Sequence, residues 1–307
     1  MQIFTSVDDI RIEEKTAVAL GNFDGIHIGH TEILKNAIEA AKLEGLKSLC
    51  YTFSNHPFNF IMHREATDPE AIKLICSEED KIAMLEEMGF DYLVNVPFDE
   101  VTMKMHAHDF FEDILVKKLN AAVISVGFNY TYGTRAEGKA EDLLVEGATK
   151  GIEVHVHDAV MYEDKVVSST LIREMIAAGD MAKTEELLGR PYAFTGVVEH
   201  GKSVGKQKGF PTVNIVPEAD RALPPKGVYA AITNVEGVDY KSIANLGIQP
   251  TFDGTTTKIE SHLFDYCGNA YDKNIIVSLK KFIRPEMKFA SSDELYEQIR
   301  KDCEAVL

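Results

Sequence analysis

The order of strand-like and helix-like segments constrains this chain most strongly, because that order changes once along its length. Up to about residue 185, short apolar runs alternate with segments whose apolar residues repeat at helical spacing. This alternation predicts parallel strands joined by helices that cover both faces of a sheet. After the Gly-Arg-Pro at residues 189–191, short strands separated by Gly, Pro and Asn turns follow, and a helix after Ser291 ends the chain. The second pattern predicts an antiparallel barrel or sandwich.

The predicted elements fall into two groups. In the first we expect strands at residues 16–20, 46–53, 91–96, 121–127 and 152–157, and helices at 30–42, 77–88, 107–119 and 141–150. In the second we expect strands at residues 194–198, 213–216, 228–235, 242–246, 259–264 and 275–282. We therefore place two domains at residues 1–185 and 186–307, each long enough to bury its own core.

Composition narrows the classes of partner. The 307 residues carry a net charge of −17, which repels nucleic acid and anionic membranes. No apolar run is long enough to span a bilayer, and the first residues lack the pattern of a signal peptide. The four cysteines are too widely spaced for a zinc site or a disulfide framework. We expect a cytoplasmic protein whose partners are small molecules, and the sequence indicates no oligomeric state.

A glycine-rich segment with two histidines follows the first predicted strand. Residues 21–30 read GNFDGIHIGH and lead into the first predicted helix. Strand-to-helix turns at the carboxyl edge of a parallel sheet bind nucleotides, and glycines let the backbone approach a phosphate. His27 and His30 can face the same side and stabilise the charge that develops as pyrophosphate leaves. An isolated H-x-x-H is more often a surface pair or half of a metal site, but the surrounding residues favour a phosphate site.

A second candidate site lies in the C-terminal region. Thr212 and Asn214 are two residues apart on a predicted strand, so their side chains point to the same face. A hydroxyl and an amide oxygen suit a Mg²⁺ ion that already carries nucleotide phosphates. Glu260 lies on another predicted strand and could act as general base toward a substrate hydroxyl. Taken alone, a glutamate on a strand is more often exposed to solvent.

The loop before Thr212 is rich in glycine and lysine. We expect it to close over phosphates through Gly205, Lys206, Lys208 and Gly209. Residues 196–203 also match the P-loop pattern G-x-x-x-x-G-K-[ST]. A P-loop requires a helix directly after the Lys-Ser pair, whereas here two more glycines and a Phe-Pro follow. We therefore reject the P-loop interpretation.

The N-terminal motifs resemble those of a known superfamily. Residues 21–30 are similar to the HxGH signature of adenylyl and cytidylyl transferases, and residues 167–173 (VSSTLIR) resemble their second motif, [IV]SSTxIR. Alone, residues 168–170 would be only a cluster that caps a helix. The resemblance implies that His27 and His30 stabilise the transition state. It also implies a set of residues that bind ATP and its phosphates: Gly21, Phe23, Asp24, Gly29, Ser169, Thr170 and Arg173.

The C-terminal motifs resemble those of riboflavin kinases in order and spacing. They are GFPTVN at residues 209–214, PKGVYA at 225–230, IESHLFD at 259–265 and IRPEMKF at 283–289. With the N-terminal motifs, nearly the whole chain resembles the bacterial bifunctional riboflavin kinase/FAD synthetase family. This resemblance implies a Rossmann-like nucleotidyltransferase domain followed by a Greek-key antiparallel β-barrel with a C-terminal helix.

The family resemblance also implies a chemistry. In that family the barrel phosphorylates riboflavin to FMN with ATP and Mg²⁺, and the N-terminal domain transfers AMP from a second ATP to FMN, giving FAD and pyrophosphate. Thr212 and Asn214 match the magnesium ligands, and Glu260 matches the catalytic base. Asn129, within residues 127–133 (GFNYTYG), matches a residue of the flavin and nucleotide site, and Arg284 is expected on the flavin side of the kinase site.

Two alternatives remain open. One is a riboflavin kinase whose N-terminal domain has become a regulatory or flavin-binding module, although intact His27, His30 and Arg173 argue against it. The other is an adenylyltransferase for pantetheine phosphate or nicotinate mononucleotide fused to an unrelated barrel, which the GFPTVN segment disfavours. The chain also departs from the family's usual FxPHP and RFG segments, because it has FSNHP at residues 53–57 and TYG at 131–133.

Overall fold

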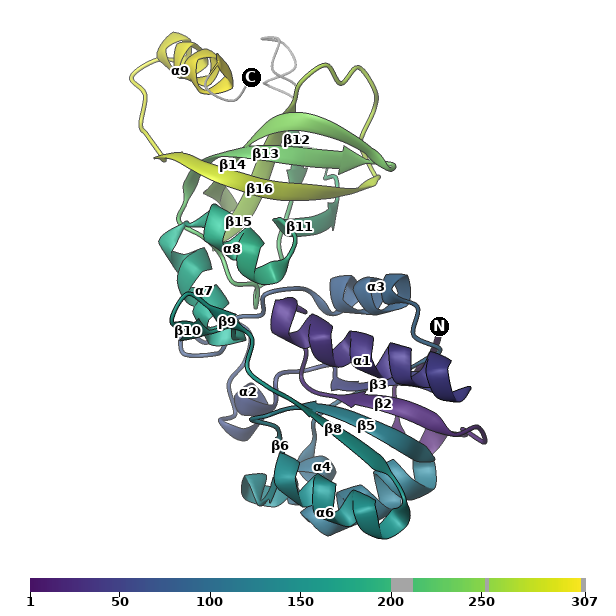
Figure 1. Ribbon diagram of the computed structural model, residues 1–307. Helices are drawn as coiled ribbons and strands as arrows, with labels where there is room; N and C mark the ends of the chain where they lie inside the picture. The colour runs from purple at the N-terminus through teal and green to yellow at the C-terminus, as the bar shows by residue number, and fades with distance from the viewer. Residues whose placement is uncertain (200–211, 252–253, 305–307) are drawn as a thin grey trace. The chain divides into compact units, whose positions relative to one another are not determined.

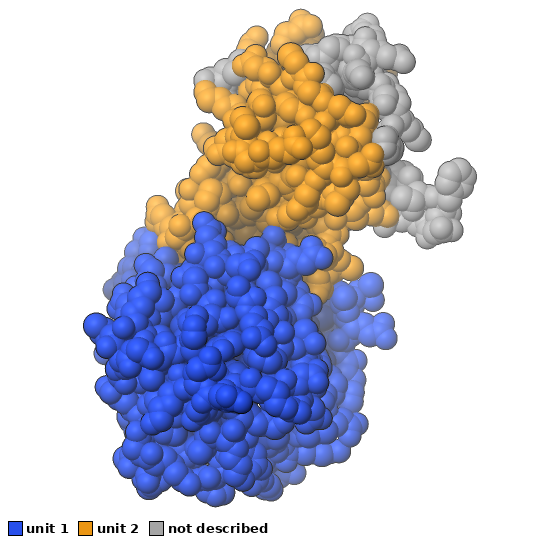
Figure 2. All heavy atoms as spheres, turned by 90° about the vertical axis from the view of Figure 1, so that its right-hand side faces the viewer, with its two compact units in different colours: residues 1–169 blue, residues 170–307 orange. Residues whose placement is uncertain are grey.

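The chain forms two compact units, Met1–Ser169 and Thr170–Leu307, shown in different colours in Figure 2. The computed structural model describes residues 1–199, 212–251 and 254–304. The predicted phosphate loop with Gly205, Lys206, Lys208 and Gly209 therefore lies outside the described residues. None of the described helices combines the length and the apolar character needed to cross a membrane.

The first unit is built on a six-stranded parallel sheet in the order β1-β4-β3-β2-β5-β8 (Figure 1). Counted from β2 along the chain, the last five strands follow the order 3-2-1-4-5, which is the doubly wound Rossmann arrangement. The order reverses between β2 and β5, so a ligand crevice is expected at the carboxyl ends of these two strands. The strands are β1 (Gln2–Phe4), β2 (Thr16–Leu20), β3 (Lys47–Phe53), β4 (Tyr92–Val96), β5 (Ala121–Gly127) and β8 (Glu153–His157).

Helices cover both faces of this sheet, and each face has its own core (Figure 1). On β2, Val18 and Leu20 pack with Phe110 and Phe111 on one face, while Ala19 packs with Leu34 and other α1 residues on the opposite face. Strands buried on both faces explain the continuous apolar runs in the sequence. The helices are α1 (Ile28–Glu44), α2 (Pro57–Ile61), α3 (Glu78–Met88), α4 (Glu100–Lys104), α5 (Ala107–Asp109), α6 (Ala140–Lys150) and the short turns η1 (Val7–Asp9) and η3 (Thr134–Ala136).

Local signals in the sequence define the ends of two predicted helices. Ser77 caps α3 by accepting a hydrogen bond from the Asp80 N–H, as expected, and Gly45 ends α1 in the left-handed conformation with φ 68°. The helix expected at residues 107–119 is different in kind. Its main part, η2 (Phe110–Lys118), is a π-helix, and the Leu119 N–H donates to the Ile114 carbonyl, five residues earlier. Apolar periodicity alone does not distinguish a π-helix from an α-helix.

The second unit begins one residue into α7 (Ser169–Ala178), includes α8 (Met181–Leu188) and continues as an antiparallel sheet. The sheet order is β11-β16-β13-β14-β15-β12, so β16, β13, β14 and β15 form a Greek key in the order 4-1-2-3. The edge strands meet where the Glu199 N–H donates to the Asn214 carbonyl at 2.9 Å, which curls the sheet into the predicted barrel. The strands are β11 (Tyr192–Val197), β12 (Thr212–Ile215), β13 (Gly227–Val235), β14 (Val238–Thr251), β15 (Gly254–Leu263) and β16 (Asn274–Pro285).

The barrel has an inner and an outer face. Tyr229, Ala244, Ser261 and Leu263 are buried on the inner face, and the residues that alternate with them lie on the outer face. The predicted terminal helix is present as α9 (Ser292–Glu304). It covers part of the outer face, where its Ile299 and Cys303 pack against Val228 and Ile243. Two short hairpins in the first unit complete the structure: β6 (Thr131–Tyr132) with β7 (Gly138–Lys139), and β9 (Met161–Tyr162) with β10 (Lys165–Val166).

Candidate active sites

The turn between β2 and α1 has an unusual backbone. Phe23 and Ile26 have positive φ values of 48° and 39°, a region that residues other than glycine rarely adopt and that a β-branched side chain strongly disfavours. The surroundings hold this strained conformation. The Phe23 ring is fully buried, and the Asp24 carboxylate accepts a hydrogen bond from the Ile75 N–H at 2.9 Å. Strain of this kind is concentrated at functional sites.

The glycines of the turn make room for rings and side chains. A Cβ on Gly21 would lie 2.8 Å from the Phe23 ring, and one on Gly29 would lie 3.3 Å from the His27 ring. Gly25 has φ 82°, and a Cβ there would lie 2.7 Å from the Ile75 side chain. The glycine spacing of the motif therefore follows from packing inside the turn, in addition to any approach to a phosphate.

The structure brings the two predicted histidines into direct contact. The His27 and His30 rings stack with centroids 3.6 Å apart, and Phe23 meets His30 edge-on. His27 is only 5% exposed, and its Nδ1 caps α1 by accepting from the His30 N–H at 3.2 Å. Phe23 and His27 are thus buried and support the His30 ring, whereas His30 itself is half-buried.

His30 is held as a neutral imidazole. Burial lowers its pKa well below the ordinary value of 6.5, and His27 and Lys81 lower it further. The His30 Nδ1 atom is buried and has no hydrogen-bond partner among the described residues. Burying a lone pair without a partner at Nδ1 costs less free energy than burying an N–H without one. The His30 tautomer that carries its proton on Nε2 is therefore favoured. In this form His30 can donate a hydrogen bond to a phosphate oxygen without carrying charge.

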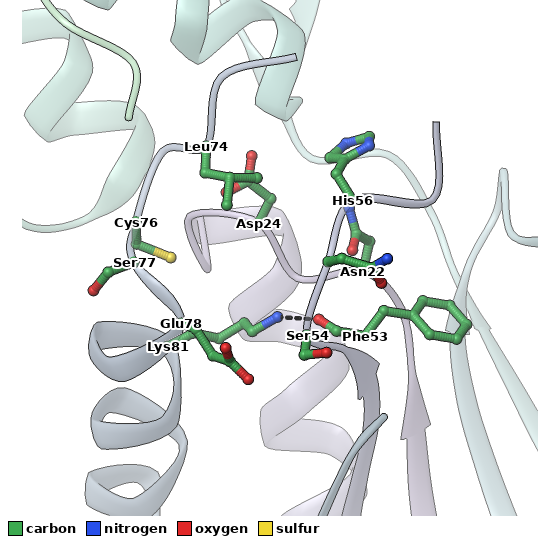
Figure 3. A pocket seen from close by; sticks show the side chains of 11 residues that line it. Asn22, Asp24, Phe53, Ser54, His56, Leu74, Cys76, Ser77, Glu78 and Lys81 are labelled. Atoms are coloured by element: carbon green, nitrogen blue, oxygen red, sulfur yellow. Dashed lines mark hydrogen bonds between the residues drawn. The ribbon is translucent and has the colours of Figure 1, made fainter. Parts of the chain in front are cut away.

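A pocket beside the turn contains a residue that the motifs do not indicate. Figure 3 shows Lys81 reaching from α3 to the Phe53 carbonyl, to which its Nζ donates at 2.6 Å. Lys81 is only 7% exposed, burial lowers its pKa, and it forms no ion pair with a described carboxylate. Such buried cations are typical of functional sites. The pocket is lined by Asn22, Asp24, Phe53, His56, Glu78 and Lys81, among others.

Two other predicted groups lie near the same edge of the sheet. The Ser169 hydroxyl donates to the Asp24 carbonyl at 3.0 Å, which places the start of the VSSTLIR motif beside the histidine turn. Asn129 follows β5, the neighbour of β2 at the point where the strand order reverses. Thr170 and Arg173 continue along α7 in the second unit, and their contacts with phosphates stay predictions.

In the second unit, strand register brings the predicted kinase residues together. Asn214 on β12 is directly opposite Glu260 on β15, and Thr212 is opposite His262. Directly opposed residues of antiparallel strands project to the same face, so all four lie on the outer face of the barrel. The Asn214 Oδ1 atom is buried and accepts no hydrogen bond from the described residues. An acceptor oxygen without a described donor fits the predicted role of Asn214 as a ligand of Mg²⁺, a hard cation.

Arg284 lies on the same outer face of the barrel but already forms an ion pair with Asp302. Val228 on β13 is opposite Arg284 on β16, which puts Arg284 on the outer face. Its Nε and Nη2 donate to the buried Asp302 carboxylate of α9 at 3.0 and 2.6 Å, and Nη1 donates to the Pro285 carbonyl. In this arrangement Arg284 ties α9 to the barrel, and its place on the flavin side of the site stays a prediction.

Fold and sites together define a class of two-domain transferase, with a Rossmann-type nucleotide-binding unit followed by a Greek-key barrel. Family models described as FAD synthetase and riboflavin kinase match residues 9–171 and 188–307. The chain therefore belongs to the bifunctional riboflavin kinase/FMN adenylyltransferase family, as the sequence motifs indicated. The riboflavin kinase match removes the alternative of an unrelated barrel.

The names of individual sequence relatives agree with this assignment. Bifunctional riboflavin kinase/FMN adenylyltransferases of Escherichia coli (strain K12) and Bacillus subtilis (strain 168) are each 35% identical over 293 residues, covering 94% of this chain and 91% of theirs. The crystal structure of a macrolide-efflux protein from Streptococcus pneumoniae has a TM-score of 0.85 at 31% identity, covering 99% of this chain and 97% of that one.

Proposed function

We propose that the chain makes FAD from riboflavin in two steps, at two separate sites. The domain of residues 186–307 phosphorylates riboflavin to FMN with ATP, and the domain of residues 1–185 transfers AMP from a second ATP to FMN. The cytoplasm, which supplies ATP, is the proposed location. The observation that supports the proposal is that each unit brings its own set of motif residues together, the stacked histidines in one and the Asn214–Glu260 pair in the other.

In the adenylyl transfer, an FMN phosphate oxygen attacks the α-phosphorus of ATP and the bond to the β-phosphate oxygen breaks, releasing pyrophosphate. The attacking oxygen is already anionic, so no general base is required. His30 donates from Nε2 to the α-phosphate as charge develops, and His27 fixes its ring by stacking. Ser169, Thr170 and Arg173 are proposed to bind the departing pyrophosphate. Asn129 is proposed to contact flavin and nucleotide.

In the kinase reaction, the terminal hydroxyl of riboflavin attacks the γ-phosphorus of ATP and ADP leaves. Glu260 accepts the proton of that hydroxyl. Thr212 and Asn214 would hold Mg²⁺, which when bound neutralises charge on the transferred phosphate. The loop with Gly205, Lys206, Lys208 and Gly209 is proposed to cover the phosphates. In the other domain, the proposed ATP-binding turn contains Gly21, Phe23, Asp24 and Gly29. Phe23 contributes to it through packing alone, because its ring is buried.

The test uses the intact protein with riboflavin, ATP and Mg²⁺, and FMN and FAD are resolved by chromatography. His30→Ala is expected to leave FMN formation unchanged and to lower FAD formation at least about 100-fold, the usual scale for one oxyanion-type donor. Glu260→Gln is expected to abolish FMN formation but to leave FAD formation from added FMN intact. Loss of both reactions on either substitution would contradict two separate sites.

A further inference from the structure

Asn245 on β14 extends the row of polar residues that contains the proposed kinase residues. Its Cα partner on one side is Glu260 of β15, and Glu260 is in turn opposite Asn214 of β12. Three adjacent strands, each about 4.8 Å from the next, therefore present Asn214, Glu260 and Asn245 in a line on the outer face. No sequence motif indicates Asn245, because the row is formed only when the three strands pair.

The Asn245 side chain is polar and half-buried. It forms no hydrogen bond or ion pair with any described residue. Its Nδ2 lies 3.2 Å from the position that a Cβ on Gly247 would take, so the amide is directed along β14, and the Glu286 carboxylate occupies the space over the same glycine. An amide whose donor and acceptor are not engaged by any described residue can bind a ligand group that both donates and accepts, as a hydroxyl does.

The row changes character on the far side of Asn245. The next residue across is Val228 of β13, which is buried and packs with Ile243 and with Cys303 of α9. Asn245 thus lies between the Glu260 carboxylate and apolar residues that α9 already covers. Groups of a substrate that lie next to the reacting hydroxyl along this row are therefore met by the Asn245 amide, which suits hydroxyls.

We propose that Asn245 binds the hydroxylated side chain of riboflavin beside the hydroxyl that Glu260 deprotonates, and that it determines specificity in the kinase reaction. The inference rests on the proposed function of the C-terminal unit. The amide can donate to one hydroxyl and accept from another, which holds the chain extended along the row and presents its terminal oxygen to Glu260.

The test replaces Asn245 in the intact protein with Leu, which has a similar size but no polar group, and with Asp, which keeps the size and an acceptor. For Asn245→Leu we expect kcat/KM for riboflavin to fall by about 10- to 100-fold, mainly through KM. KM for ATP and FAD formation from added FMN should stay within about two-fold of the wild-type values. Asn274→Ala, at an exposed position on β16, is the control and should change none of these quantities.

Riboflavin analogues that each lack one side-chain hydroxyl make the test specific. With the wild type, removal of the hydroxyl that Asn245 contacts raises KM, and with Asn245→Leu the same removal has no further effect. An unchanged KM for riboflavin in both variants, or equal rises of KM for riboflavin and ATP, would overturn the inference. If Glu260→Gln keeps full kinase activity, the proposed kinase site itself is wrong, which is a separate result.

Discussion

Gly29 shows how one missing side chain controls the histidine pair. Its φ is not in the left-handed region, so the constraint is space, and a Cβ there would lie 3.3 Å from the Nδ1 and Cε1 atoms of His27. His27 both caps α1 and stacks on His30, so a displaced His27 ring disturbs the cap and the stack together. A side chain at position 29 would therefore press on the His27 ring.

We predict that Gly29→Ala lowers FAD formation at least about 10-fold, because a small displacement of a catalytic group has a large effect on rate. FMN formation by the same protein should not change. Gly45→Ala is the matched control, since Gly45 has φ 68° and open space around it. It should destabilise the fold by about 1 kcal/mol with both activities retained. Equal FAD formation in wild type and Gly29→Ala would show that the His27 position is not critical.

Residues differ in how far the sequence reveals them. His27 and His30 are recognisable because motif spacing is local, and the structure places their rings in contact. Lys81 is four residues before Leu85 on the buried stripe of α3, a signal that lies outside the nucleotidyltransferase motifs. Asn245 gives no such signal, since its neighbours come from strands distant in sequence.

At the scale of elements, α9 is attached to the barrel by one buried ion pair. The Arg284 guanidinium binds the Asp302 carboxylate through two nitrogens, and the Asp302 side chain is only 4% exposed. The strand-like and helix-like patterns predicted β16 and α9 but not this contact, nor the π-helical form of η2. The period of the apolar residues in the sequence identifies strands and helices. A contact such as Arg284–Asp302, between two of these elements, forms only in the folded barrel.

We predict that Asp302→Ala weakens the attachment of α9 by about 3 kcal/mol, because it takes the carboxylate away from the largely buried Arg284 guanidinium. Hydrogen exchange of the α9 amides measures this loss directly. Glu297→Ala removes an exposed ion pair with Lys301 on the same helix and should cost less than about 0.5 kcal/mol. If the two variants exchange at the same rate, α9 is held by its apolar contacts with Val228 and Ile243.

At the scale of the whole molecule, the net charge of −17 acts on anionic substrates before they reach either site. ATP and FMN are anions and riboflavin is neutral, so the repulsion discriminates among the substrates of the two reactions. Salt shortens the Debye length from about 30 Å at 0.01 M to about 8 Å at 0.15 M, which screens long-range repulsion. Contacts within a site are screened much less.

We predict that KM for ATP in both reactions, and KM for FMN, fall as NaCl is raised from about 0.01 to 0.15 M, because screening removes the repulsion that slows the approach of anions. KM for riboflavin should stay constant over the same range, which makes it the internal control in the same protein. Steady-state kinetics at fixed Mg²⁺ measure all four constants. A rise of KM for ATP with salt would mean that local positive charge at the sites, and not the acidic surface, dominates the approach of the nucleotide.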